Sequence, residues 1–318
     1  MVNELESRTI GSLRFPLAVM VVAIHSYISI DGWSYSDIAN MGVGANVAQF
    51  FMIAIGHVLS HIAVPTFFLI SAYLLFNNFG DGDVPVWKRK LSSRQKSLVL
   101  PYVIWIVLYV IWLTLLGYKT VLDCGLIEWI HAHGGLKMFW CSKTWNLERV
   151  DLWGNPATAS APILVPLWFL RDLIVCVFLF SPIFFALFKR RNSKALLIIG
   201  LVLLSFLYYT QTSLYLPGFS PHTLFYFGIG SAMALQNTSI TELFSKHKYL
   251  IWGLFIVLFV VEVALDGHNS VVGNIIYPFY VLVGVVFIVN TFSVNKLNVG
   301  GGGNVPFSFL LSISLYYH

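Results

Sequence analysis

Two polar side chains bound the first long apolar run of the sequence, 14-RFPLAVMVVAIH-25. Arg14 opens this run and His25 closes it, and ionisable groups are costly to bury in an apolar segment. In a helix, their spacing amounts to three turns plus about 20°, so both project from one stripe about 16 Å apart. There, Arg14 can hold an anion and His25 can exchange a proton. The plainer interpretation is that Arg14 anchors the helix at lipid headgroups and that His25 is a hydrogen-bonded core residue.

The composition places this pair in a membrane protein. Of the 318 residues, 58% are hydrophobic and 10% are charged, whereas soluble domains carry about 25% charged residues. The first apolar run has no small-residue cleavage pattern, so we expect a retained span. Long apolar runs without alternation exclude a β-barrel. We therefore predict an all-α, polytopic membrane protein that forms one domain over residues 1–318.

The apolar runs predict about nine to ten transmembrane helices, since a span needs about 20 mostly apolar residues. A break is expected at Pro65, inside the second and longest run. The last run is a short stub that follows four glycines, so we expect the chain to be truncated there or its last helix to be lost. The predicted spans are 10–29, 47–77, 98–117, 167–188, 195–210, 222–236, 250–265, 272–292 and the stub 305–318.

The distribution of Lys and Arg predicts a cytoplasmic N-terminus. Threading the spans in that orientation leaves four basic residues outside, at positions 119, 137, 143 and 149. The inner side receives thirteen of the nineteen, at positions 8, 88, 89, 90, 94, 96, 189, 190, 191, 194, 246, 248 and 296. This asymmetry is typical of membrane topology. It explains the basic clusters without nucleic acid, which we do not expect as a partner.

The longest predicted outer loop, 118–165, is rich in tryptophan. Its tryptophans are either interfacial anchors or a platform that stacks on sugars, and they are Trp129, Trp140, Trp145 and Trp153. Cys124 and Cys141 lie in the same loop, and they can pair only in an oxidising compartment.

Histidine pairs in the sequence do not make a convincing metal site. His57 and His61 lie one helical turn apart, but the glutamate of a His-Glu-x-x-His motif is missing, and no carboxylate or thiol is near. His131 and His133 lie in the long loop. Glu262 is an intramembrane carboxylate, which is either functional or able to reach the outer surface. We predict no metal.

Four segments in register resemble the membrane acyltransferase-3 family, the bacterial O-acyltransferases of polysaccharides and related acceptors. The resemblance covers roughly residues 8–300, and Ala72 stands where the family usually has glycine. The segments are the Arg-x10-His spacing of Arg14 and His25, 64-VPTFFLISAYLLF-76, 88-KRKLSSRQKSLVLPY-102 and 166-PLWFLRDLIV-175.

This resemblance implies a reaction in the bacterial cytoplasmic (inner) membrane. An acyl group, usually acetyl, passes from cytosolic acyl-CoA to a hydroxyl of a cell-envelope or exported glycan or a lipid-linked saccharide, without a further cofactor. His25 would be the general base. Arg14 would bind or orient the donor by charge-assisted hydrogen bonds, and Arg94 and Lys96 are placed to reach a CoA phosphate.

The same resemblance directs attention to polar residues of two later spans as substrate-binding candidates. These are Ser71 and Tyr73 in the second span and Trp168, Arg171 and Asp172 in the fourth. Each has a plainer interpretation: Ser71 and Tyr73 as interhelical hydrogen-bonding groups, and Arg171 with Asp172 as an ion pair shared with other helices.

Two other functions stay open at this point. The chain can be a multi-span carrier for a polar or lipid-linked solute, with Arg14, His25 and Glu262 as its ionisable path. Carriers often show inverted repeats and paired broken helices, and neither is visible in the sequence. The chain can also be a non-catalytic scaffold, because of its short final run.

Overall fold

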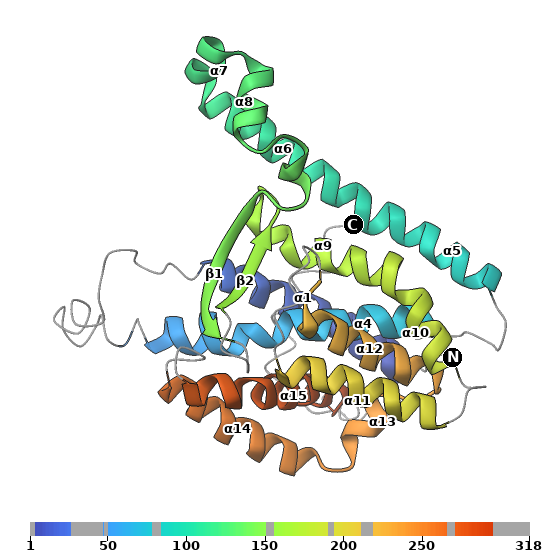
Figure 1. Ribbon diagram of the computed structural model, residues 1–318. Helices are drawn as coiled ribbons and strands as arrows, with labels where there is room; N and C mark the ends of the chain where they lie inside the picture. The colour runs from blue at the N-terminus through green and yellow to red at the C-terminus, as the bar shows by residue number, and fades with distance from the viewer. Residues whose placement is uncertain are drawn as a thin grey trace, which may run out of the picture.

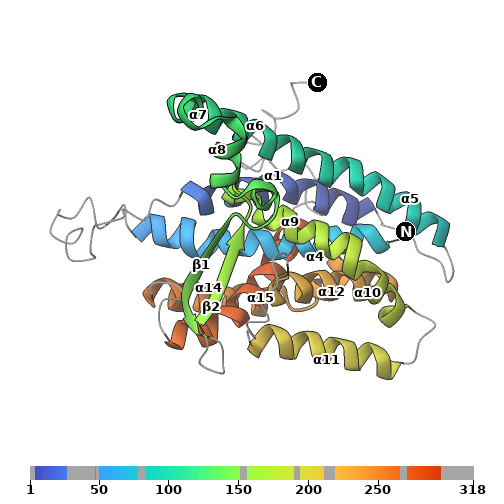
Figure 2. The same cartoon turned by 45° about the horizontal axis from the view of Figure 1, so that its top comes forward.

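Long helices dominate the structure, and most of them run side by side in one bundle (Figure 1). The computed structural model describes residues 4–26, 47, 50–77, 84–150, 156–189, 194–210, 219–265 and 271–294. The predicted stub 305–318 lies outside the described residues. In Figure 2, α11 and the α5–α6 arm border opposite sides of the bundle.

The first half of the chain supplies the helices that carry most of the predicted site. In chain order these elements are α1 Glu4–Ser26, η1 Met52–Val58, η2 Leu59–Ile62, α4 Ala63–Phe76, α5 Val84–Arg94, η3 Gln95–Val99, α6 Leu100–Leu116, α7 Tyr118–Cys124, α8 Leu126–Ala132 and η4 Gly135–Phe139.

The second half begins with a hairpin and continues with helices. Its elements are β1 Lys143–Val150, β2 Pro156–Ala161, η5 Val165–Leu167, α9 Trp168–Val175, η6 Cys176–Phe180, α10 Ser181–Phe188, α11 Lys194–Thr210, α12 Pro221–Leu235, α13 Ile240–Ser245, α14 Lys248–Ala264 and α15 Val271–Val294.

The described helices agree with the positions of the predicted spans before the stub. Among the described residues, five helical stretches are long and apolar enough to cross a membrane: Glu4–His25, Met52–Phe76, Pro85–Leu116, Val165–Phe188 and Ile275–Ser293. The remaining predicted spans correspond to α11, α12 and α14, which have 17, 15 and 17 residues. The total of nine to ten and the cytoplasmic N-terminus stay predictions.

The all-α prediction missed a β-hairpin in the long loop. Strands β1 and β2 pair antiparallel, with Lys143 opposite Ala161 and Asn146 opposite Thr158. The register shifts between Asn146 and Val150. The segment contains Thr, Trp and Val, which favour strands, but it has no long apolar run. A search for membrane spans therefore passes over it.

The second span is irregular before Pro65 rather than at it. Turns of π-helix and 3-10 helix cover Met52–Ile62, and regular helix begins at Ala63. Proline has no N–H group to donate and its ring crowds the carbonyl four residues earlier, which places the distortion upstream. Such irregular turns recur at functional sites.

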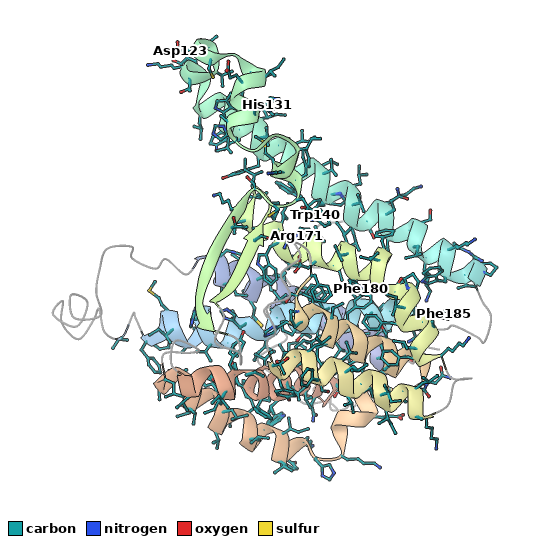
Figure 3. The ribbon with its side chains drawn as sticks, viewed as in Figure 1. Asp123, His131, Trp140, Arg171, Phe180 and Phe185 are labelled. Atoms are coloured by element: carbon teal, nitrogen blue, oxygen red, sulfur yellow. The ribbon has the colours of Figure 1, made fainter. Side chains whose placement is uncertain are left out.

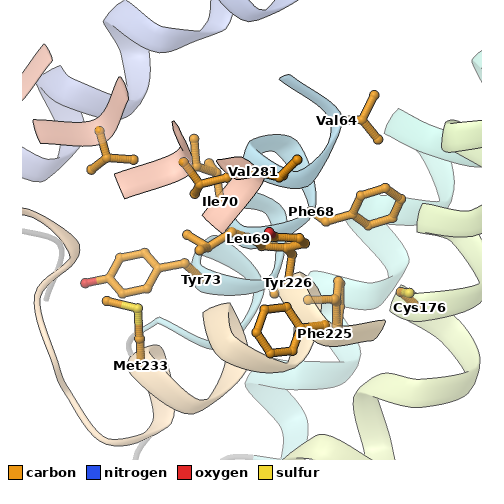
Figure 4. Packing of buried hydrophobic residues seen from close by; sticks show 14 of the residues in the cluster. Val64, Phe68, Leu69, Ile70, Tyr73, Cys176, Phe225, Tyr226, Met233 and Val281 are labelled. Carbon is orange, nitrogen blue, oxygen red and sulfur yellow. The ribbon is translucent and has the colours of Figure 1, made fainter. Parts of the chain in front are cut away.

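The core of the bundle is the contact between α4 and α12 (Figure 4). A side chain on Gly230 of α12 would place its Cβ 2.2 Å from the carbonyl oxygen of Leu69 and 3.1 Å from Ala72 Cβ. Small residues at this crossing let the two backbones approach closely, as is usual between membrane helices. Ala72 is fully buried, so its small size fits this contact.

Candidate functional site

Helix α1 carries both Arg14 and His25, so the helical spacing predicted for them holds. The helix is anchored by one stripe of buried side chains: Glu6, Thr9, Ile10, Leu13 and Leu17. Arg14 and His25 lie beside this stripe, and both side chains are exposed. Pro16 lies inside the helix between them.

A second basic residue lies near Arg14. Arg94, the last residue of α5, is half-buried and interacts electrostatically with Arg14. Among the described residues, neither side chain forms a salt bridge or a hydrogen bond. This interaction between two cations is repulsive, and an anion bound between them would offset it. Lys96 follows in η3 and is exposed.

Lys90, on the same helix as Arg94, has a structural role that sequence analysis missed. Its Nζ donates to the carbonyl oxygens of Leu74 at 3.3 Å and Leu75 at 3.1 Å, and also to that of Asn77. These carbonyls lie at the C-terminal end of α4, where helical partners run out. The lysine therefore caps α4 and fixes α5 against it, which positions Arg94.

The two candidates on α4 differ in what they contact. The Tyr73 hydroxyl donates to Glu6 Oε1 on α1 at 2.8 Å, and both residues are buried. Ser71 is also buried, but its hydroxyl finds no hydrogen-bond partner among the described residues. Phe67 and Leu74, which share its face, are the two residues of α4 that are only partly buried. Tyr73 thus joins two helices, whereas Ser71 lies on the most open face of α4.

Arg171 and Asp172 form a buried and fully bonded centre on α9, and Trp168 is partly buried at the start of that helix. The Arg171 guanidinium lies 2.8 Å from Asp172 Oδ1. It also donates to the Trp140 carbonyl at 2.8 Å and to both oxygens of Ser160, at 3.0 and 3.1 Å. Figure 3 shows Arg171 beneath Trp140, where the hairpin meets the bundle. The pair therefore anchors the long loop to α9.

The tryptophans of the long loop have different surroundings. Trp129 is buried and stacks on His133 with ring centres 4.0 Å apart. Trp140 is 39% exposed. The side chain of Trp145 and all of Trp153 lie outside the described residues. Of the two tryptophan side chains of this loop that the structure describes, Trp140 is the exposed one and so the one that could stack on a sugar.

The described residues contain no group of three or more His, Cys, Asp or Glu that could hold a metal ion. The rings of His57 and His61 lie 5.2 Å apart. Cys124 and Cys141 are free thiols.

Comparisons with known proteins point to the same family as the four sequence segments described above. The acyltransferase-3 family model, an acyltransferase domain, matches residues 9–316. The succinoglycan biosynthesis protein ExoH of Rhizobium meliloti (strain 1021) is 32% identical over 148 residues, which are 45% of this chain and 34% of that protein. The match thus spans about a third of the length of that relative. No solved structure matches the chain.

Proposed function

Because the chain belongs to the acyltransferase-3 family, we propose that it transfers an acyl group from acyl-CoA to a hydroxyl of a cell-envelope or exported glycan. Acetyl is the acyl group we expect. The relative named for succinoglycan biosynthesis supports a polysaccharide acceptor. The apolar helices support a multi-pass membrane location, and we assign the bacterial cytoplasmic membrane with the N-terminus inside.

The observation that carries this proposal is the pair of neighbouring cations, Arg14 and Arg94. They come from two different helices and interact electrostatically, and no carboxylate pairs with either among the described residues. CoA supplies phosphates, and arginine binds phosphate through paired, charge-assisted hydrogen bonds. We assign Arg14 and Arg94 to the CoA phosphates and Lys96 to the edge of the same site.

His25 is assigned as the general base. It lies about 16 Å beyond Arg14 along the same stripe of α1. As the acceptor oxygen attacks the thioester carbonyl, the hydroxyl proton passes to the imidazole. The carbon–sulfur bond then breaks, and the CoA thiolate leaves and takes up a proton. General-base catalysis contributes about 10²- to 10⁴-fold to rate.

The test uses membranes that contain the protein, labelled acetyl-CoA and the envelope glycans of the host. We expect label in glycan with the wild type and loss of most transfer with His25→Ala. His247→Ala is the matched control, since His247 precedes α14 and is exposed. Equal transfer by wild type and His25→Ala would exclude His25 as the base. Solute movement without consumption of acetyl-CoA would instead favour the carrier.

A further inference from the structure

A continuous row of histidine and tyrosine rings crosses one end of the bundle. The rings of His57 and His61 meet edge to face, with ring centres 5.2 Å apart. The ring centres of His61 and Tyr277 of α15 lie 6.1 Å apart. The ring centres of Tyr277 and His222 of α12 lie 6.2 Å apart, and those of His222 and Tyr208 of α11 lie 5.0 Å apart. We call these five residues the His–Tyr row. It joins four separate stretches of the chain.

The row lies at the same end of the bundle as His25. Helix α1 packs along η1, η2 and α4, and the hydrogen bond from Tyr73 to Glu6 sets their relative height. Counting about 1.5 Å of rise per residue, His57 lies about 24 Å from Tyr73 along the second span, and His25 lies about 28 Å from Glu6 along α1. The two histidines therefore lie within about one helical turn of each other in height.

Hydrogen bonds hold the elements of the row in place. The Tyr208 hydroxyl is bonded to the Tyr226 hydroxyl at 2.9 Å and donates to the Pro278 carbonyl at 3.0 Å. Tyr280 donates to the Val58 carbonyl at 3.1 Å, within the irregular turns next to His57. These bonds tie α11 to α12 and α15, and they tie α15 to the irregular turns of the second span. Such preorganised support is characteristic of binding sites.

The row remains partly accessible although its tyrosines are buried. His57, His61 and His222 are each half-buried, whereas Tyr208 and Tyr277 are buried. Imidazole rings offer both a hydrogen-bond donor and an acceptor, and aromatic rings with a polar edge suit amphipathic ligands. Several intramembrane ionisable groups gathered from distant stretches indicate function. A sugar, with apolar faces and many hydroxyls, fits this combination.

We propose that the His–Tyr row is the acceptor subsite, which binds a saccharide and presents one of its hydroxyls to His25. The assignment rests on the proposed acyl transfer. It differs from the acceptor candidates predicted from sequence, because Tyr73, Arg171 and Asp172 are engaged in helix-to-helix and loop contacts. Donor and acceptor would then occupy opposite ends of the stripe that joins Arg14 to His25.

The first test separates acceptor binding from donor binding by kinetics. We expect Tyr277→Phe, His61→Gln and His222→Gln to raise the KM for succinoglycan oligosaccharides about tenfold and to leave the KM for acetyl-CoA unchanged. Tyr249→Phe and His247→Gln are the controls, since Tyr249 and His247 are exposed. Unchanged acceptor KM, or an equal change in both KM values, would overturn the proposal.

The second test needs no turnover and so separates this proposal from the reaction itself. Wild-type membranes are treated with diethyl pyrocarbonate, and histidine modification is mapped by mass spectrometry. We expect succinoglycan oligosaccharides to protect His61 and His222 at least threefold and acetyl-CoA alone to protect neither. Protection without any acyl transfer would support the subsite while the proposed reaction fails. Absence of protection in a membrane that transfers label would overturn the subsite alone.

Discussion

Arg171 and Arg14 are two arginines in apolar helices, and their surroundings are opposite. Arg171 is 3% exposed, is paired with Asp172 and donates to the backbone and side chain of the long loop. Arg14 is exposed, and its charged neighbour is another arginine, Arg94. A guanidinium whose donors are already used can stabilise the fold but has little left for a ligand.

The difference separates two interpretations that sequence analysis had left side by side. For both arginines, the sequence allowed a structural role and a functional role. For Arg171 the contacts favour the structural role, and its role with Asp172 in substrate binding stays a prediction. For Arg14 the repulsion from Arg94 favours a site that an anion completes. The predictions below test this contrast, beginning with the largest effect.

Removal of Arg171 should destabilise the protein most. Arg171→Met leaves Asp172 as a buried carboxylate without its cation, and breaking such a pair costs about 3–5 kcal/mol. We expect a clear fall in the thermal unfolding midpoint in detergent, measured by size-exclusion chromatography after heating. Arg171→Met combined with Asp172→Leu should recover much of that loss. A midpoint unchanged in Arg171→Met would refute the anchoring role.

Arg14→Ala should leave the unfolding midpoint unchanged and weaken donor use. A charge-assisted hydrogen bond contributes about 1.5–3 kcal/mol, so the KM for acetyl-CoA should rise about 10- to 100-fold. Arg14→Lys should recover only part of this, because lysine lacks the paired geometry. The contrast with Arg171 fails if Arg14→Ala lowers stability and leaves the KM for acetyl-CoA as it was.

The neighbouring residues Ser71 and Tyr73 offer the same contrast on one helix. Tyr73→Phe removes the hydrogen bond to buried Glu6 and should cost about 1–2 kcal/mol of stability, with little effect on transfer per folded molecule. Ser71→Ala removes a hydroxyl without a partner among the described residues and should leave stability unchanged. The check is to measure the unfolding midpoint and the transfer rate of both variants under the same conditions. Equal midpoints for Tyr73→Phe and Ser71→Ala would contradict the contrast.

The smallest effect is expected at Lys96, which is exposed. Lys96→Ala should raise the KM for acetyl-CoA by about two- to fivefold in low salt. Because mobile ions screen exposed charges, the difference should vanish near 0.5 M NaCl. A difference that persists at high salt would place Lys96 in direct contact with the donor.

Sequence predicted the membrane helices and the positions of Arg14 and His25 well, because apolar length and helical spacing are local properties. The family resemblance assigned Arg14 and Arg94 to the same donor. The sequence did not show that the two side chains interact, since that depends on how Lys90 holds α5 against α4. The hairpin was missed because its residues have no long apolar run. The His–Tyr row was missed because His61, His222 and Tyr277 are far apart in the sequence, and only the packing of the helices brings them together.

The most direct test of the central claim is equilibrium binding of labelled acetyl-CoA to purified protein without any acceptor. If the Arg14–Arg94 pair holds the donor, Arg14→Ala and Arg94→Ala should each raise the Kd about tenfold or more. The Arg171→Met, Asp172→Leu double variant should bind like the wild type once folded protein is matched. Wild-type affinity in both arginine variants would contradict the account.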